Sequence, residues 1–337
     1  MRLLVLGGTQ HVGRASVETA LARGDEVTCV NRGSARPAPG VDARVADRRT
    51  PGALAAALGT DSWDAVLDTW SAEPVVVGEA ARLLEGRAGH YTYISSRSVY
   101  RWPIPSGADE SAPVLDADPA STSAEDYAKA KRGGELAAVA GFGNGLGDGV
   151  LLARAGLILG PYEVVGRLPW WLDRIAAGGR VVAPGPADRR LQYVDARDLA
   201  AWTLHCADSG IVGAFNAVSP PGHTTIGELL AQCVAATGSG AELVEVAPEV
   251  IEAAGLTGWT DLPIWAPPIG EIAALHDGNA SAAAATGLRC RPVADTVADT
   301  WAWLQVEGTP EPPSGRAGTL GISAETEAAL LKSAAGS

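Results

Sequence analysis

Short apolar runs and longer alanine-rich segments alternate along the first half of the chain. The runs have strand length and the segments have helical length. The expected strands are 3–6, 26–30, 65–68, 90–94 and 149–153, and the expected helices are 13–23, 51–58, 74–84 and 124–140. Repeated strand–helix–strand units need right-handed crossovers and build a parallel sheet with both faces covered. The pattern predicts a doubly wound α/β domain.

The pattern changes after about residue 160, where tryptophans, prolines and helical segments dominate. We expect a first domain over 1–160 and a smaller, partly helical lobe over 161–337 that binds substrate. Segments near 190–220 and 272–280 are expected to return to the first domain. Residues 308–318 are typical of a linker to a short helix at 324–332.

Composition narrows the classes of partner. The 337 residues carry a net charge of -13, which argues against binding to nucleic acid or to an anionic membrane. The apolar start at 2–6 is too short for a signal peptide, and no stretch approaches the roughly 18 apolar residues of a membrane span. The four scattered cysteines suggest neither a disulfide framework nor a metal site. We expect a soluble cytoplasmic protein that acts on a small molecule.

A glycine-containing turn follows the first expected strand and opens a helix. Gly7 and Gly13 keep the spacing of a dinucleotide fingerprint, although Gln10 stands where the middle glycine is usual. Tight glycine turns let the backbone approach a pyrophosphate, which the helix N-terminus attracts. The residues expected to contact the cofactor here are Gly7, Thr9, Gln10, His11, Val12 and Gly13.

The end of the second expected strand indicates which cofactor is bound. Dinucleotide folds that prefer NAD carry an acidic residue there, whereas this chain has Asn31 followed by Arg32. A guanidinium pairs with a 2'-phosphate, so NADP(H) is favoured over NAD(H). Asp47 is placed to meet the adenine amino group, or else is a solvated turn carboxylate.

Tyr127 and Lys131 stand four residues apart, so one helix face presents both. A cation beside a phenol stabilises the phenolate and makes a tyrosine usable as a general acid or base. The chain has only three lysines and six tyrosines, which makes a chance match rare. Serines 95, 96 and 98 follow another expected strand, at the sheet edge where such folds bind ligands.

Together, the glycine turn, the SSxxxY strand exit, the YxxxK helix and the segment 154–161 resemble the extended or atypical short-chain dehydrogenases/reductases, the NAD-dependent epimerase/dehydratase superfamily. The resemblance covers about residues 1–305 and implies a Rossmann domain. It also implies a catalytic triad of Ser96, Tyr127 and Lys131, with Lys131 on the nicotinamide ribose. Thr69, Trp70 and Ser71 would line the ribose side. A homodimer through the 74–84 helix and the Tyr127 helix is expected.

Three departures from the family pattern bear on the substrate. Sugar-nucleotide dehydratases of this superfamily carry Asp and Glu where this chain has Arg97 and Ser98. An epimerase asparagine that contacts the substrate pyrophosphate falls on Leu157. A substrate-phosphate arginine falls on Leu191, although Arg189 and Arg190 are adjacent and could substitute for it. Leucine therefore occupies two positions at which epimerases of the superfamily contact the phosphates of a nucleotide sugar.

Aromatic side chains are expected around the substrate. Flat aromatic surfaces suit an apolar or aromatic ligand, although Trp170 and Trp171 could instead pack the second lobe. The expected substrate-pocket residues are Ser98, Tyr100, Trp102, Leu157, Arg167, Trp170 and Trp171.

The sequence thus predicts an NADP(H)-dependent oxidoreductase of ketoreductase or alcohol dehydrogenase type, acting on an apolar or polycyclic carbonyl compound. Two alternatives remain open at this stage. One is a nucleotide-sugar epimerase that retains NAD, and the other is a non-catalytic NADP-sensing protein.

Overall fold

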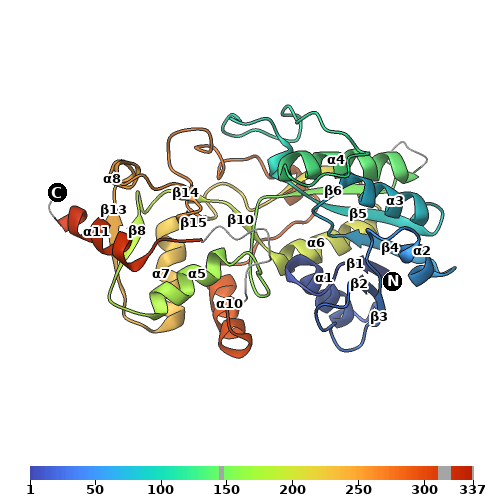
Figure 1. Cartoon of the computed structure of the whole chain (residues 1–337), viewed down its shortest axis with the longest axis horizontal. Coiled ribbons are helices and arrows are strands. Elements are labelled where there is room, and N and C mark those ends of the chain that lie inside the picture. The colour runs from blue at the N-terminus through green and yellow to red at the C-terminus, as the bar shows by residue number, and fades with distance from the viewer. Residues whose placement is uncertain (144–147, 310–319, 336–337) are drawn as a thin grey trace.

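The computed structural model describes residues 1–143, 148–309 and 320–335, which form two lobes (Figure 1). The strands of the first lobe are β1 (Arg2–Leu6), β2 (Glu26–Asn31), β3 (Asp42–Val45), β4 (Trp63–Asp68), β5 (Ala88–Ser96), β6 (Val150–Ala155) and β11 (Gly213–Ala217). Its helices are α1 (His11–Ala22), α2 (Ala53–Leu58), α3 (Pro74–Leu84), the short η1 (Arg97–Val99), α4 (Tyr127–Gly141), α6 (Ala196–Ser209) and α9 (Ser281–Ala285).

The seven strands form one parallel sheet in the order β11-β6-β5-β4-β1-β2-β3. The order reverses at β1, where the chain leaves β1 toward β2 on one side and later returns to β4 on the other. In such sheets ligands bind beyond the carboxyl ends of the strands at this switch point. The sheet is Rossmann-like, in agreement with the predicted doubly wound domain.

Both faces of the sheet are covered, which explains the continuous apolar strands. Leu3 and Val5 point into a core shared with α1 and α6, and Leu4 and Leu6 point into the opposite core, shared with α2, α3 and α4. Alternate residues of one strand therefore serve different cores.

The second lobe packs helices around small sheets. Its helices are α5 (Arg167–Ala176), α7 (Ile226–Thr237), α8 (Pro248–Ala253), α10 (Val293–Glu307) and α11 (Ala324–Ala335). Its strands pair as β8 (Arg180–Pro184) with β13 (Glu242–Val246), β9 (Arg190–Leu191) with β12 (Thr224–Thr225), and β14 (Gly258–Trp259) with β15 (Leu262–Pro263). Between the lobes, β7 (Leu157–Leu159) pairs with β10 (Tyr193–Asp195).

The chain crosses between the lobes more than once. After α5 and β8 it returns through β10 to α6, which packs on α1, and then adds β11 to the main sheet. The chain meets the first lobe again at Asn279, whose main-chain amide donates to the Ala108 carbonyl. Most of the linker expected at 308–318 lies outside the described residues. Beyond it, α11 covers the helix expected at 324–332.

β3 is absent from the apolar runs that predict the other strands. Its four residues are mostly exposed because β3 is the edge strand of the sheet. An edge strand exposed in this way lacks the apolar run by which the buried strands are recognised.

Candidate active site

The glycine turn between β1 and α1 is packed too tightly for larger residues. A Cβ atom at Gly13 would lie 2.5 Å from the Gly8 amide nitrogen, and one at Gly7 would collide with the Thr69 hydroxyl. Gly7 and Gly8 also take positive φ angles, which favour glycine. The glycine turn, helix α1 and the end of β4 thus lie as close together as a dinucleotide fingerprint requires.

Gln10 does not disturb this turn. It has an extended backbone (φ -139°, ψ 149°) that any residue adopts, and its side chain is exposed. The missing middle glycine therefore carries no conformational cost.

His11 begins α1 with a positive φ of 39°, and its amide donates to the Tyr162 carbonyl at 3.1 Å. Tyr162 also has a positive φ, 66°. Burial lowers the pKa of the His11 ring to about 4, so the ring is neutral near pH 7.

The residues at the ends of β2 and β3 are open to solvent or form local turns. Asn31 accepts a hydrogen bond from the Gly33 amide at 2.7 Å, and Arg32 is exposed. Asp47 is also exposed and accepts from the Arg49 amide at 3.0 Å, as a turn carboxylate does. No acidic side chain stands at the end of β2.

The three expected catalytic residues come from β5 and α4. Ser96 ends β5, and its Oγ donates to the Ser98 hydroxyl at 3.1 Å. Tyr127 is the first residue of α4, after the N-cap Asp126, and its side chain is 39% exposed. Lys131 lies one turn further along and is 3% exposed.

The Lys131 ammonium group is held at the carboxyl edge of the sheet. Its Nζ donates to the main-chain carbonyls of Trp70 and Ile94, each at 2.7 Å, and lies 4.8 Å from the centre of the Tyr93 ring. These partners follow β4 and lie in β5, so the ammonium bridges two strand ends.

A buried polar network that the sequence analysis did not identify lies behind Ser96. Glu135, fully buried in α4, accepts from the Ser95 hydroxyl at 2.7 Å and from Arg154 Nε at 2.9 Å. Arg154 also donates to the Tyr100 hydroxyl, which in turn donates to Asn216. Glu135 stands four residues after Lys131, so the spacing of Tyr127, Lys131 and Glu135 is a signal that could have found it.

Among the residues expected to line the nicotinamide ribose, the Thr69 hydroxyl donates to the Leu6 carbonyl at 3.0 Å and Ser71 is exposed. Trp70 is half-buried, and its indole nitrogen donates to the Glu73 carbonyl at 3.1 Å. The three residues follow β4 directly, beside the glycine turn.

Three of the expected substrate-pocket residues are buried in the structure. Trp171 is fully buried in the second-lobe core and donates to the Pro263 carbonyl, and Leu157 belongs to the same core. Tyr100 is 1% exposed, and its hydroxyl donates to Asn216 in the polar network behind Ser96. In the structure these three side chains pack within the lobes, and their place in a substrate pocket stays a prediction.

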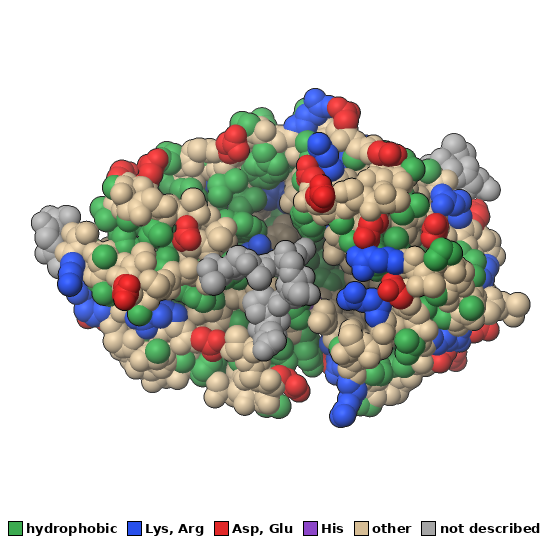
Figure 2. All heavy atoms as spheres, viewed as in Figure 1, with side chains coloured by type: hydrophobic (Ala, Val, Ile, Leu, Met, Phe, Trp, Pro, Cys, Tyr) green, Lys and Arg blue, Asp and Glu red, His purple; other side chains and the backbone are tan. Residues whose placement is uncertain are grey.

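The remaining pocket candidates are partly open. Ser98 and Trp102 are half-buried after β5. Trp170 packs edge-to-face on Trp171, and the Arg167 guanidinium lies 4.6 Å from the centre of the Trp259 ring. Figure 2 shows a hollow where the two lobes meet, with apolar side chains along the second-lobe side.

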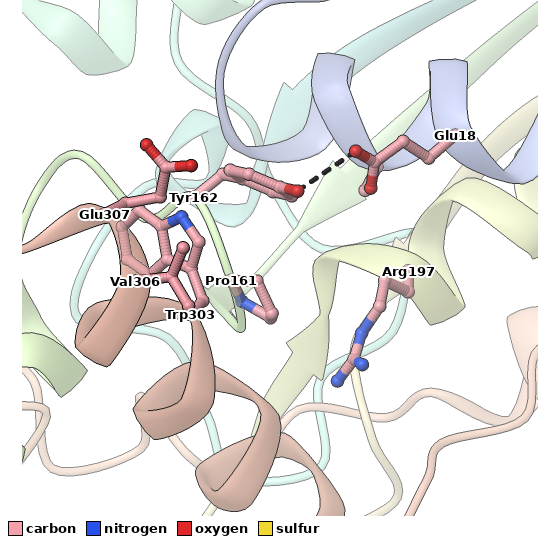
Figure 3. Close-up of a pocket in the computed structure, with 8 residues that line it drawn as sticks. Glu18, Pro161, Tyr162, Arg197, Trp303, Val306 and Glu307 are labelled. Atoms are coloured by element: carbon pink, nitrogen blue, oxygen red, sulfur yellow. Dashed lines mark hydrogen bonds between the residues drawn. The ribbon is translucent and has the colours of Figure 1, made fainter. Parts of the chain in front are cut away.

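Two pockets lie outside the catalytic group. One of about 340 Å³ is bounded by α1, α6, α10 and Tyr162, whose hydroxyl donates to Glu18 at 3.0 Å (Figure 3). The other, of about 350 Å³, includes Arg189, Arg190 and Asp277. Neither is lined by Ser96, Tyr127 or Lys131, so neither pocket alone marks the site.

Potential metal ligands and thiols are dispersed over the described part of the chain. Within it, no group of three or more His, Cys, Asp or Glu side chains could hold a metal ion. The four cysteines are free thiols, three of them buried. No described helix has both the length and the apolar character to cross a bilayer.

A family model, the NAD dependent epimerase/dehydratase family, matches residues 3–217. The chain belongs to this family. It is therefore an enzyme of the short-chain dehydrogenase/reductase type that uses a nicotinamide nucleotide, and the matched span contains the glycine turn and the three expected catalytic residues. Comparison with curated proteins gave no match.

Solved structures share this family fold at low sequence identity. The Bordetella bronchiseptica enzyme WbmH, in complex with NAD+, is 19% identical, with a TM-score of 0.66 over 91% of this chain and 99% of that one. A Thermus thermophilus UDP-glucose 4-epimerase, solved with NAD, is 18% identical (TM-score 0.64, 91% and 100% covered). The human epimerase family protein SDR39U1, solved with NADPH, is 21% identical (TM-score 0.58, 90% and 99%). At these identities the likeness supports the fold.

Proposed function

We propose that this family member is an NADP(H)-dependent oxidoreductase that interconverts a ketone and a secondary alcohol on an apolar or polycyclic small molecule. The observation that carries the proposal is the buried Lys131 ammonium, held by two carbonyls at the sheet edge one helical turn from Tyr127. A fixed cation beside a phenol is the arrangement needed for proton transfer to a carbonyl oxygen.

The residues fit a nicotinamide nucleotide. The close packing of Gly7 and Gly13 suits a pyrophosphate at the start of α1, and Thr69, Trp70 and Ser71 stand beside that turn. When bound, the nicotinamide supplies or accepts the hydride. Tyr127 donates the proton to the substrate oxygen during reduction, Ser96 donates a hydrogen bond to the same oxygen, and Lys131 stabilises the resulting phenolate.

The preference for an apolar substrate rests on two positions where polar contacts to a substrate pyrophosphate are expected and leucine stands instead. Leu157 and Leu191 are buried in the second-lobe core, where related epimerases are expected to carry polar contacts to a pyrophosphate. Arg189 donates to the carbonyls of Ala266, Pro267 and Ala273. Its hydrogen bonds thus serve the fold of the second lobe.

Tyr127→Phe tests the catalytic assignment. We expect at least about a 100-fold loss of kcat for ketone reduction, because the general acid is removed. Cofactor affinity and melting temperature should stay unchanged. Activity is measured by NADPH consumption across a panel of cyclic ketones, with Tyr162→Phe as the matched control. A near wild-type rate for Tyr127→Phe would refute the assignment.

Arg32→Asp tests the cofactor preference. The new carboxylate should repel a 2'-phosphate and weaken NADPH binding about tenfold or more, while NADH binding changes little. The affinities are measured by fluorescence titration. Arg36→Asp makes the same charge change nearby at an exposed site. If both variants weaken NADPH equally, Arg32 makes no specific contact.

A nucleotide-sugar epimerase is the second candidate, favoured by the pocket that contains Arg189 and Arg190. Arg190 pairs with Asp277 at 3.3 Å and remains largely exposed, so it could meet a pyrophosphate. An epimerase regenerates its cofactor each turnover and should copurify with NAD, whereas a reductase exchanges it. Bound nucleotide in the purified protein, together with UDP binding that is lost in Arg190→Ala, would favour the epimerase. A homodimer through α3 and α4 stays a prediction of the family resemblance.

A further inference from the structure

A buried ion pair lies directly behind the candidate site. Arg48, after β3, and Asp68, the last residue of β4, are 7% and 0% exposed. The two guanidinium nitrogens of Arg48 contact the two carboxylate oxygens of Asp68 at 2.6 and 2.8 Å. Such a two-pronged contact fixes the orientation of both groups.

Asp68 also restrains the main chain that follows it. Its carboxylate accepts from the Trp70 amide at 2.9 Å and from the Tyr91 hydroxyl at 2.6 Å. Burial works to raise the pKa of Asp68, but the Arg48 charge and the hydrogen bonds outweigh it and lower the pKa. A charged acceptor therefore holds the Trp70 backbone.

The Trp70 side chain is restrained as well. The guanidinium groups of Arg48 and Arg49 lie 5.0 and 5.1 Å from its ring centre, within the range of cation–π contacts. Arg49 pairs in turn with Glu73 at 3.0 Å. Backbone and ring of Trp70 are thus held by the same group of charges.

The Trp70 carbonyl accepts a hydrogen bond from the Lys131 ammonium. We propose that Arg48 and Asp68 are positioning residues, which hold the Trp70 carbonyl and through it fix the place of the Lys131 ammonium beside Tyr127. The proposal rests on the proposed function only for the role of Lys131. The position of the ammonium itself can be measured without a substrate.

The chain's scarcity of lysine makes this measurement direct. Lys129 and Lys332 are exposed, whereas Lys131 is buried and bonded to two carbonyls. In protein labelled with 15N at the lysine side chains, we expect one ammonium signal with slow proton exchange, from Lys131. Lys131→Met should remove that signal and so assign it.

Two variants test the chain of contacts. Arg48→Met with Asp68→Leu removes both charges together, which avoids leaving one buried and unpaired, and it removes the acceptor of the Trp70 amide. We expect the Lys131 ammonium to exchange about tenfold faster, the effect of losing one hydrogen bond of a charged donor. Arg48→Lys keeps the charge but loses the two-pronged contact, and should give a smaller increase.

Arg174→Lys is the matched control, because Arg174 forms a comparable, partly buried pair with Glu327 in the second lobe. It should leave the Lys131 signal unchanged. Unchanged exchange in the folded double variant overturns the proposal, as does equal acceleration by Arg174→Lys. If the double variant does not fold, Arg48→Lys decides by the same criterion.

Activity separates this inference from the proposed function. Tyr127→Phe should slow carbonyl reduction at least about 100-fold while leaving Lys131 exchange slow. If Tyr127→Phe stays active, the proposed function fails whatever the exchange data show. If Tyr127→Phe is inactive but the Arg48 and Asp68 variants keep slow exchange, the positioning role alone fails.

Discussion

His276 shows how a single buried residue joins distant parts of the second lobe. Its Nδ1 accepts from the Gln192 amide at 3.2 Å, and its Nε2 lies 3.0 Å from the Ile264 carbonyl. Burial lowers the pKa of His276 to about 4. The folded protein therefore keeps the ring neutral at pH values where the unfolded chain protonates it.

This shift predicts a loss of stability in acid. Because the pKa in the folded state is below the unfolded value of 6.5, the contribution is complete above pH 6.5 and is lost as the pH falls toward 4. Between pH 7.5 and 5 we expect the free energy of unfolding to drop by about 2 kcal/mol more in the wild type than in His276→Gln. Urea unfolding at both pH values measures it. Equal drops in the two proteins would show that His276 does not contribute.

Glu163 gives the stability of the protein the opposite dependence on pH. Burial raises its pKa to about 7, although its carboxylate accepts from the Arg167 and Leu168 amides at the start of α5. A raised pKa in an acid contributes stability at low pH that is lost as the pH rises through 7. Glu163 is unchanged in His276→Gln, so the comparison of that variant with the wild type removes this opposing effect.

At the level of elements, the close contact between the glycine turn and α1 depends on the lack of a side chain at Gly13. Its missing Cβ would meet the main chain of Gly8, which cannot move without displacing the end of β1. At Gly78 in α3, a Cβ would instead meet the flexible Arg82 side chain at 3.2 Å. Both glycines lie in helices, so alanine substitutions at Gly13 and Gly78 can be compared directly.

We expect Gly13→Ala to lower the free energy of unfolding by about 2 kcal/mol and to weaken cofactor binding, because the turn must open. Gly78→Ala should be neutral or stabilise by up to about 1 kcal/mol, since alanine is the better helix former. Thermal unfolding and nucleotide titration measure both effects. A Gly13→Ala protein with wild-type stability and affinity would contradict the packing argument.

Across the whole molecule, Asp195 ties the two lobes together. It is the last residue of β10 and the N-cap of α6, and its fully buried carboxylate pairs with Arg197 at 2.7 Å. The Thr296 hydroxyl of α10 donates to the same carboxylate at 2.8 Å. Arg197 also contacts Asp299 of α10. These bonds join a first-lobe helix to a second-lobe helix.

Asp195→Asn should therefore destabilise the protein by about 3 kcal/mol, because it leaves Arg197 short of its buried partner. Asp208→Asn, which alters the exposed partner of Arg23, should change stability by less than about 1 kcal/mol. Urea unfolding compares the two. Similar small losses would mean that Asp195 does not couple the lobes energetically.

The sequence by itself determined the parallel domain, the glycine turn and the spacing of Tyr127 and Lys131, because periodicity and short motifs are local properties. Its apolar runs did not include β3, whose edge position leaves it mostly exposed. Only the tertiary structure paired Arg48 with Asp68 and Glu135 with Arg154, and turned Trp171 and Tyr100 inward. Such choices depend on contacts between segments 19 or more residues apart, and no local pattern encodes them.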